Sequence, residues 1–351
     1  MRAGIRYGVG LLLAAAAAVW WGVGMAALQP LTEPLGPWPE TLYSGSAYWA
    51  RDLRWAAIVA VAAGLVLAGG GDRRWVAAAV VLGGLWTAAD VVVDRADLSG
   101  TPAAVLLAAA AVGIVALVAG LLHVRLGGPP APVERRRLVI TACVAAALLI
   151  GAACTATPQG NPAELGPAAV VTSLLTGAVA ICCALAAGPP SAPARRWWAL
   201  ALAALTALAV WAVRLAPADG RTFPRLVLGT VLITGITLLA WDRPGGRPQW
   251  RWHGLAAVWA FAGLQVVWTA VLLVARALAI GPSFTALAGN LPVQSPQEDV
   301  PVPLVALLTG LVLGLPLAWP KALGHHAGPT IPRPAGPDAA ERLGRRGQDS
   351  L

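Results

Sequence analysis

Apolar residues follow one another in long runs along most of the chain, instead of alternating with polar residues as they would on a half-buried strand. Ten of these runs reach or approach the roughly 20 residues that a helix needs to cross a lipid bilayer. Short segments rich in Pro, Gly and Arg separate the runs. The pattern predicts an all-α, polytopic bundle of transmembrane helices, with spans near residues 7–28, 55–70, 75–93, 102–124, 138–157, 167–187, 197–216, 226–241, 252–280 and 302–319.

We interpret residues 1–320 as a single transmembrane helical domain and residues 321–351 as a disordered cytoplasmic tail, because the tail is rich in Pro, Gly and Arg. The first run follows Arg2 and Arg6, as the apolar core of a signal peptide would. It is longer than such a core, so we predict an uncleaved span. The second run is short enough to extend back into the preceding loop, and the ninth is long enough to tilt or to project from the bilayer.

Composition supports this fold class and orients the helices. The chain is 58% hydrophobic and only 12% charged, whereas a soluble domain has about 25% charged residues. A net charge of +9 would suit nucleic acid, but about 18 of the 25 Lys and Arg residues fall in the two termini and the even-numbered loops. This is the positive-inside pattern. We therefore predict a lipid bilayer and no nucleic acid as partner, both termini in the cytoplasm, and a multi-pass protein of a cell membrane, the bacterial plasma membrane.

An ionisable side chain lies inside the third span. Asp90 is about four residues, or roughly 6 Å at 1.5 Å per residue, from the outer end of that span. A charge at the centre of a span costs about 2.5–3.5 kcal/mol on insertion scales, so such a residue marks a candidate functional site. Asp90, Asp94 and Asp97 have the spacing i, i+4 and i+7 and share one helix face. They could bind a divalent cation, relay protons or supply a general base, or Asp90 could form a structural ion pair.

Other charges are expected at a similar depth. Arg214 lies near the outer end of the seventh span, and Arg276 lies about one turn from the outer end of the ninth. Arg51, Asp52 and Arg54 are placed just outside the second span. This convergence predicts a polar, outward-facing cavity in the outer third of the membrane.

The candidate substrate-binding residues are accordingly Asp90, Asp94, Arg214, Arg276 and Asp52. If Asp90 is part of a structural ion pair, its candidate partners are Arg214, Arg276 and Arg54. Two arginines facing one cavity would instead suit an anionic substrate or a lipid head group. Because Asp90 lies in a span and Asp72 in a solvated turn, we expect Asp90→Asn to be the more damaging neutralisation.

The remaining polar and small residues suggest packing. Gln265, near the middle of the ninth span, is the kind of residue that forms an interhelical hydrogen bond. Gly8 and Gly10 allow helices to approach closely. Metal-ligand spacings and nucleotide-binding motifs are absent, so we predict no cofactor and no metal site. Four cysteines inside spans are interpreted as packing residues: Cys143, Cys154, Cys182 and Cys183.

Three functions remain open. Ten spans, short loops and buried charges favour a transporter or permease for a small molecule or lipid, and the layout resembles the drug/metabolite transporters in span number and compact size alone. A non-catalytic subunit or scaffold of an exporter or cell-envelope complex, with a membrane-protein partner, is the first alternative. A membrane-embedded transferase acting on a lipid-linked substrate is the second. In general layout the chain resembles polytopic lipid-sugar glycosyltransferases, and Glu33, Glu40 and Asp52 would then be candidate catalytic acids in the first outer loop.

Overall fold

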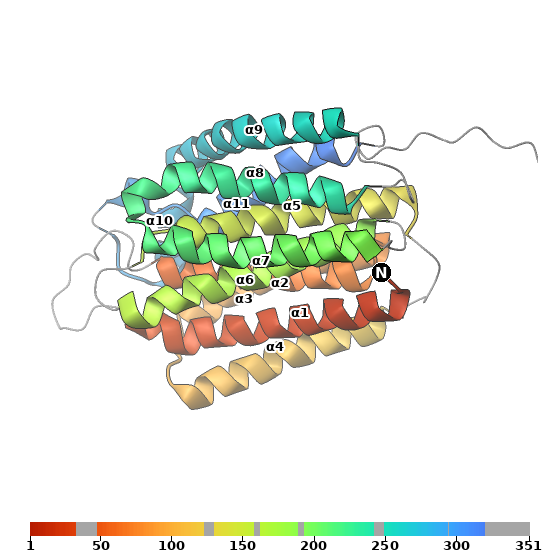
Figure 1. The fold of residues 1–351 in the computed structure, drawn as a ribbon. Coiled ribbons are helices and arrows are strands. Elements are labelled where there is room, and N and C mark those ends of the chain that lie inside the picture. Colours follow the sequence, from red (N-terminus) through yellow and green to blue (C-terminus); the bar gives the residue numbers. More distant parts are fainter. Residues whose placement is uncertain are drawn as a thin grey trace, which may run out of the picture.

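The computed structural model describes residues 1–32, 48–122, 130–157, 162–188, 193–241, 249–293 and 295–319. The long helices lie side by side in one bundle, and successive helices run in opposite directions (Figure 1). Nine helices in the described part of the chain are long and apolar enough to cross a membrane, which confirms the predicted all-α, polytopic bundle. The α-helices are α1 (Ala3–Val23), α2 (Trp49–Ala68), α3 (Arg73–Asp94), α4 (Thr101–Leu121), α5 (Pro132–Cys154), α6 (Pro162–Ala187), α7 (Pro193–Leu215), α8 (Thr222–Leu239), α9 (Trp250–Ala277), α10 (Ile280–Ala288) and α11 (Val302–Leu317).

Helix α2 corresponds to the second predicted span, which is not among those nine helices, and it differs from them in its charge. Its first two turns contain Arg51, Asp52 and Arg54, and its 20 residues are otherwise apolar. The second run was expected to be able to extend back into the preceding loop, and α2 does so: it begins at Trp49 and includes these three residues. Nearly every residue of α2 is nevertheless buried. The charged turns therefore belong to the packed interior.

Two helices end irregularly at the same end of the bundle. Helix α1 continues through a π-helical turn at Gly24–Leu28 into a 3₁₀ turn at Gln29–Leu31. Helix α9 covers nearly all of the predicted ninth span, and the short α10 follows it after a turn at Ala279, which has a left-handed φ of 47°. Non-glycine residues adopt this conformation rarely. Helix α9 alone has 28 residues, so the tilt or projection expected for this span stays a prediction.

The two ends of the bundle differ in chemistry. We call the end where α2 begins and α3 finishes the network end, and the opposite end, where α1 begins, the basic end. Successive arginines at the start of α3 and α5 lie at the basic end, and the positive-inside rule would place that end in the cytoplasm. The predicted tail at residues 321–351 lies outside the described residues.

Helices α1 and α2 touch through small residues. A Cβ atom on Gly10 would lie 2.4 Å from the backbone nitrogen of Ala68, and one on Gly64 would lie 2.9 Å from that of Ala14. On each helix a glycine and an alanine four residues apart thus form a smooth strip, the arrangement that lets membrane helices approach closely. Gly8, which the sequence also suggested as a site of close helix packing, faces open space.

We predict that Gly10→Ala destabilises the protein by about 1–3 kcal/mol, because the added methyl group meets backbone atoms that cannot rotate away. Gly8→Ala is the matched control, and it should leave stability unchanged or raise it slightly, because alanine favours the helix. Thermal unfolding of the two purified variants in the same detergent measures the difference. Equal melting temperatures would contradict the close contact between α1 and α2.

Candidate functional site

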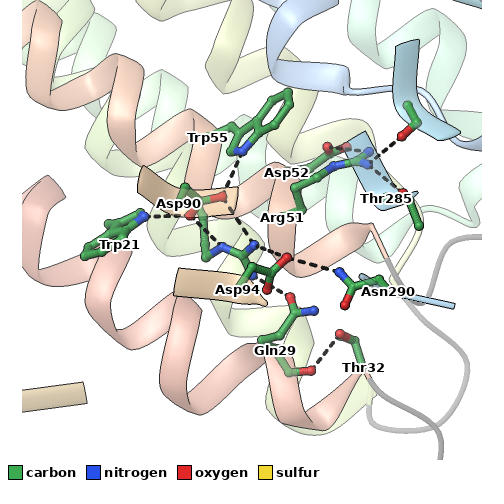
Figure 2. A network of polar contacts seen from close by, with 12 residues as sticks. Trp21, Gln29, Thr32, Arg51, Asp52, Trp55, Asp90, Asp94, Thr285 and Asn290 are labelled. Atoms are coloured by element: carbon green, nitrogen blue, oxygen red, sulfur yellow. Dashed lines mark hydrogen bonds and ion pairs between the residues drawn. The ribbon is translucent and has the colours of Figure 1, made fainter. Parts of the chain in front are cut away.

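A network of buried charges occupies the network end of the bundle (Figure 2). Its centre is Arg54 on α2, whose side chain has no exposed surface. Its Nε donates to Asp90 Oδ1 at 2.9 Å, and its Nη2 lies 3.3 Å from Asp90 Oδ2 and 3.0 Å from Asp94 Oδ2. Its Nη1 donates to Gln29 Oε1 at 2.5 Å. One guanidinium group therefore joins α2 to α3 and to the 3₁₀ turn that follows α1.

The carboxylate of Asp90 is saturated with donors. Trp21 Nε1 donates to Oδ1 at 2.7 Å, and Trp55 Nε1 donates to Oδ2 at 3.0 Å. Asp90 is only 1% exposed, and burial of an uncompensated carboxylate costs several kcal/mol. Two indole and two guanidinium N–H groups satisfy it here. Of the three arginines considered as partners, the structure pairs Asp90 with Arg54.

Asp94 lies on the same face of α3, as its spacing predicts. Besides the contact with Arg54, its Oδ2 accepts a hydrogen bond of 3.0 Å from Asn290 Nδ2. Asn290 follows α10, so the network extends to a fourth segment of the chain. Asp97 lies beyond the end of α3 in an exposed turn with a φ of 48°, and it takes no part in the described ion pairs.

The local backbone leaves room for the Arg54 side chain. A Cβ atom on Gly24 would lie 2.8 Å from Arg54 Cγ, so glycine is required at this position. Gly24 is also the first residue of the π-helical turn that leads to Gln29. π-helical turns are rare and frequently lie at functional sites. The irregular end of α1 thus accommodates the stem of Arg54 and supplies a partner for its head.

Arg51, one turn earlier on α2, makes a second set of contacts. Its Nη2 donates to Asp299 Oδ1 at 2.8 Å, and its Nη1 donates to Thr285 Oγ1 at 3.2 Å. Thr285 in turn donates to Asp299 Oδ2 at 2.6 Å. A Cβ atom on Gly281 would lie 1.9 Å from the carbonyl oxygen of Asp299, so α10 is packed directly on that backbone. This set of contacts holds α10 against the start of α2.

Asp52 is bonded differently from the other carboxylates. Its Oδ2 accepts from the backbone N–H of Val302 at 3.2 Å, where a negative charge favours the N-terminus of α11. Its Oδ1 lies 3.5 Å from Arg51 Nη2 and has no hydrogen-bond partner among the described residues. Asp52 and Trp49 both line a small cavity, and the Trp49 indole N–H also lacks a partner in the described part of the chain. The cavity has room for about one water molecule, which could bridge these two groups.

The other predicted site residues lie apart from this network. Arg214 donates to the carbonyl oxygen of Thr155 at 2.6 Å and to the hydroxyl of Thr157. Arg276 is exposed on the last turn of α9. Each of the described ion pairs involves Arg51 or Arg54, so neither Arg214 nor Arg276 is joined to Asp90 within the described ranges. A substrate-binding role for these residues stays a prediction.

Gln265 forms a contact between helices, as expected from its position. Its Oε1 accepts a hydrogen bond of 3.1 Å from Arg225 of α8. Glu33 and Glu40, the candidate acids of the first outer loop, lie outside the described residues. Sequence reasoning missed several members of the network: Trp21, Gln29, Thr285, Asn290 and Asp299. Of these five, only Trp21 gave a signal in the sequence, because a buried indole N–H needs a hydrogen-bond acceptor.

Comparisons add no family to this description: the chain matches no protein-family model, no curated protein and no solved structure. Within the described ranges, no three His, Cys, Asp or Glu side chains are grouped so that they could hold a metal ion.

We predict that Asp299→Asn loosens α10. The substitution leaves the buried Arg51 guanidinium with Asp52 as its remaining carboxylate partner, so exchange of the amide hydrogens in residues 280–288 should accelerate at least about tenfold, or about 1.4 kcal/mol. Hydrogen–deuterium exchange with mass spectrometry measures the effect. Asp97→Asn removes the same charge from an exposed left-handed position that asparagine tolerates, and it should leave this exchange unchanged. Identical exchange in both variants would show that Asp299 does not hold α10.

Proposed function

We propose that the protein is a permease-like membrane protein that binds an amphipathic, lipid-like molecule in a lateral groove and moves it across the bilayer. The observation that carries the proposal is an apolar groove of about 570 Å³ bounded by α2, α3, α5 and α11. Ligand sites for small molecules have volumes of about 300–1,000 Å³. A groove of this size and polarity suits an apolar ligand better than a polar solute.

Apolar side chains and bare backbone form most of the groove wall. Helix α3 contributes Val80 and Gly83, α2 contributes Ala62, α5 contributes Ile140 and α11 contributes Leu307. Few residues of α3 are buried in the bundle, and Val80 is 69% exposed. The groove therefore opens beside a helix whose remaining surface would face lipid, so an acyl chain could enter it from the side.

The length of the groove matches one leaflet of a bilayer. It follows α3 from Val76 to Thr87, a rise of roughly 16 Å at 1.5 Å per residue. Half of a typical hydrocarbon core is about 15 Å. The occupant would extend from the basic end to about the middle of the membrane.

The polar groups of the groove favour a head group at one end. Arg137 lines it at the basic end, where its Nη1 donates to the carbonyl oxygen of Gly71 at 2.9 Å. The hydroxyls of Thr87 and Thr141 donate to carbonyl oxygens in their own helices, so they offer little attraction to a polar solute. Arg137 would attract an anionic head group, while the rest of the wall takes an apolar chain.

The charge network would be the barrier at the other end of this path. Asp90 lies one turn beyond Thr87 on α3, and there Arg54 joins α2, α3 and the end of α1. In this arrangement the network end is fastened while the groove is open at its side. Movement of a head group past the network would require these ion pairs to separate, and such a two-state element is what a permease needs.

Reconstitution into liposomes tests the proposal. The wild-type protein should accelerate the transbilayer movement of a fluorescent phosphatidylglycerol, and Gly83→Phe should reduce the rate at least about fivefold by filling the groove. A Cβ atom on Gly83 has room, since its nearest neighbour is Ala62 Cβ at 3.9 Å, so the variant should still fold.

Gly113→Phe on α4 is the matched control. It introduces the same side chain at an exposed helical glycine with open space around it, and it should leave the rate unchanged. A wild-type rate equal to that of protein-free liposomes, or equal rates for the two phenylalanine variants, would contradict the proposal.

A further inference from the structure

Three arginines lie at the network end of the bundle, in α7, α8 and the turn between them. Arg214 lies in the last turn of α7, Arg221 ends the short 3₁₀ turn at Ala218–Arg221, and Arg225 lies in the first turn of α8. Nη1 of Arg214 and Nη1 of Arg221 donate to the same carbonyl oxygen, that of Thr155, at 2.6 and 2.7 Å. Two guanidinium groups therefore lie side by side just beyond the end of α5.

Arg225 approaches the same region from α8. A Cβ atom on Gly151, one turn before Thr155 on α5, would lie 3.3 Å from the ring of Trp268, which Arg225 contacts. Arg225 donates to Gln265 at 3.1 Å, and its guanidinium lies 5.4 Å from the centre of the Trp268 ring. We call Arg214, Arg221 and Arg225 the arginine cluster.

The arginine cluster lacks a compensating carboxylate within the described ranges. Each ion pair there belongs to Arg51 or Arg54, which the fold matches with aspartates. The carbonyl groups at the end of α5 offset only part of the charge, because a helix C-terminus carries about half of one negative charge. Arg221 also donates to the carbonyl oxygens of Ala216 and Arg214, which are uncharged acceptors, so a bound anion would neutralise charge that the described residues do not.

The donors of the cluster fit an acceptor with several oxygens. Arg225 Nε is buried and has no hydrogen-bond partner among the described residues. An unsatisfied buried donor costs about 1–3 kcal/mol, and more when it is charged. Arg214 and Arg225 are half-buried, so the cluster remains accessible from the surface. Guanidinium groups bind phosphate oxygens in bidentate pairs, which gives the planar arginine fork an advantage over lysine.

We propose that the arginine cluster is a binding site for a phosphate group at the network end of the bundle. The site is separate from the groove and does not depend on the transport proposal. The phosphate belongs either to the head group of an anionic lipid or to a soluble phosphate, and both present the same oxygens to Arg225.

Thermal unfolding in an uncharged detergent tests the site. Short-chain phosphatidic acid should raise the melting temperature of the wild-type protein by at least about 3 °C at saturation, and short-chain phosphatidylcholine should do so much less. A parallel titration with inorganic phosphate against chloride at equal ionic strength separates the two sources. Stabilisation by inorganic phosphate indicates a soluble anion, and stabilisation by the lipid alone indicates a head group.

Two variants separate an anion site from a purely structural role. Arg225→Gln should weaken binding of the stabilising anion at least about tenfold. Without ligand its stability should stay close to that of the wild type, because removal of the unpartnered Nε offsets the lost contacts with Gln265 and Trp268. Arg95→Gln removes the same charge from an exposed position at the same end, and it should leave binding unchanged.

The proposal is overturned if neither phosphate source stabilises the wild type. It is also overturned if Arg225→Gln is destabilised without ligand while binding is unaffected, because the arginine would then serve packing alone. If Arg225→Gln and Arg95→Gln lost binding equally, the anion would respond only to the net charge of the protein, and this result would overturn the site as well.

Discussion

A guanidinium group with no exposed surface must be neutralised within the protein, and in this bundle that requirement falls on Arg54. Its position inside α2 would be very costly in a bilayer without partners. The partners come from two other segments: α3 supplies Asp90 and Asp94, and the turn after α1 supplies Gln29. Each of these side chains is itself buried. If one of these side chains moved away, the charges that remain buried would lose a partner. The contacts of Arg54 therefore hold the helices at the network end together.

The contacts between helices change in character with distance from Arg54. One turn away, Arg51 and Asp299 hold α10 across the start of α2, and Asp52 meets the first turn of α11. Towards the basic end the contacts become apolar, and α1 and α2 meet through glycine and alanine. Along α3 the packing is incomplete, and that is where the groove opens. A rigid polar end beside a loosely covered apolar flank is the physical basis of the proposed path for an amphipathic ligand.

Much of the fold could be predicted from the sequence, because a bilayer leaves few choices for a long apolar run. The spans and their alternation follow from length and hydropathy alone. The second run was short enough to extend back into the loop, but hydropathy could not say how far, because Arg51, Asp52 and Arg54 become acceptable in a packed helix only through their tertiary partners. The end of α9 was predicted to within three residues, because Gly281 and Pro282 follow the turn at Ala279 and a proline just beyond a helix is a stop signal. Helix α10 was not predicted, because no helix was expected between residues 280 and 302.

The candidate site was only partly predictable. The spacing of Asp90 and Asp94 fixed their common face, but three arginines were equally plausible partners until the helices were placed in space. Gln29 and Asn290 carry no distinctive sequence pattern, because their importance arises from which helix ends meet. Arg221 and Arg225 lie between the predicted spans 197–216 and 226–241, and their position relative to Arg214 depends on the turn between α7 and α8.

The most direct test of the central role of Arg54 is a double-mutant cycle with Arg54→Gln, Asp90→Asn and the double variant, followed by thermal unfolding in detergent. Breaking a buried pair typically costs about 3–5 kcal/mol, so both single variants should be far less stable than Asp72→Asn, in which asparagine can still cap α3. The account predicts a coupling energy above about 0.5 kcal/mol, since Arg54 and Asp90 are in direct contact. Additive effects, or single variants as stable as Asp72→Asn, would contradict it.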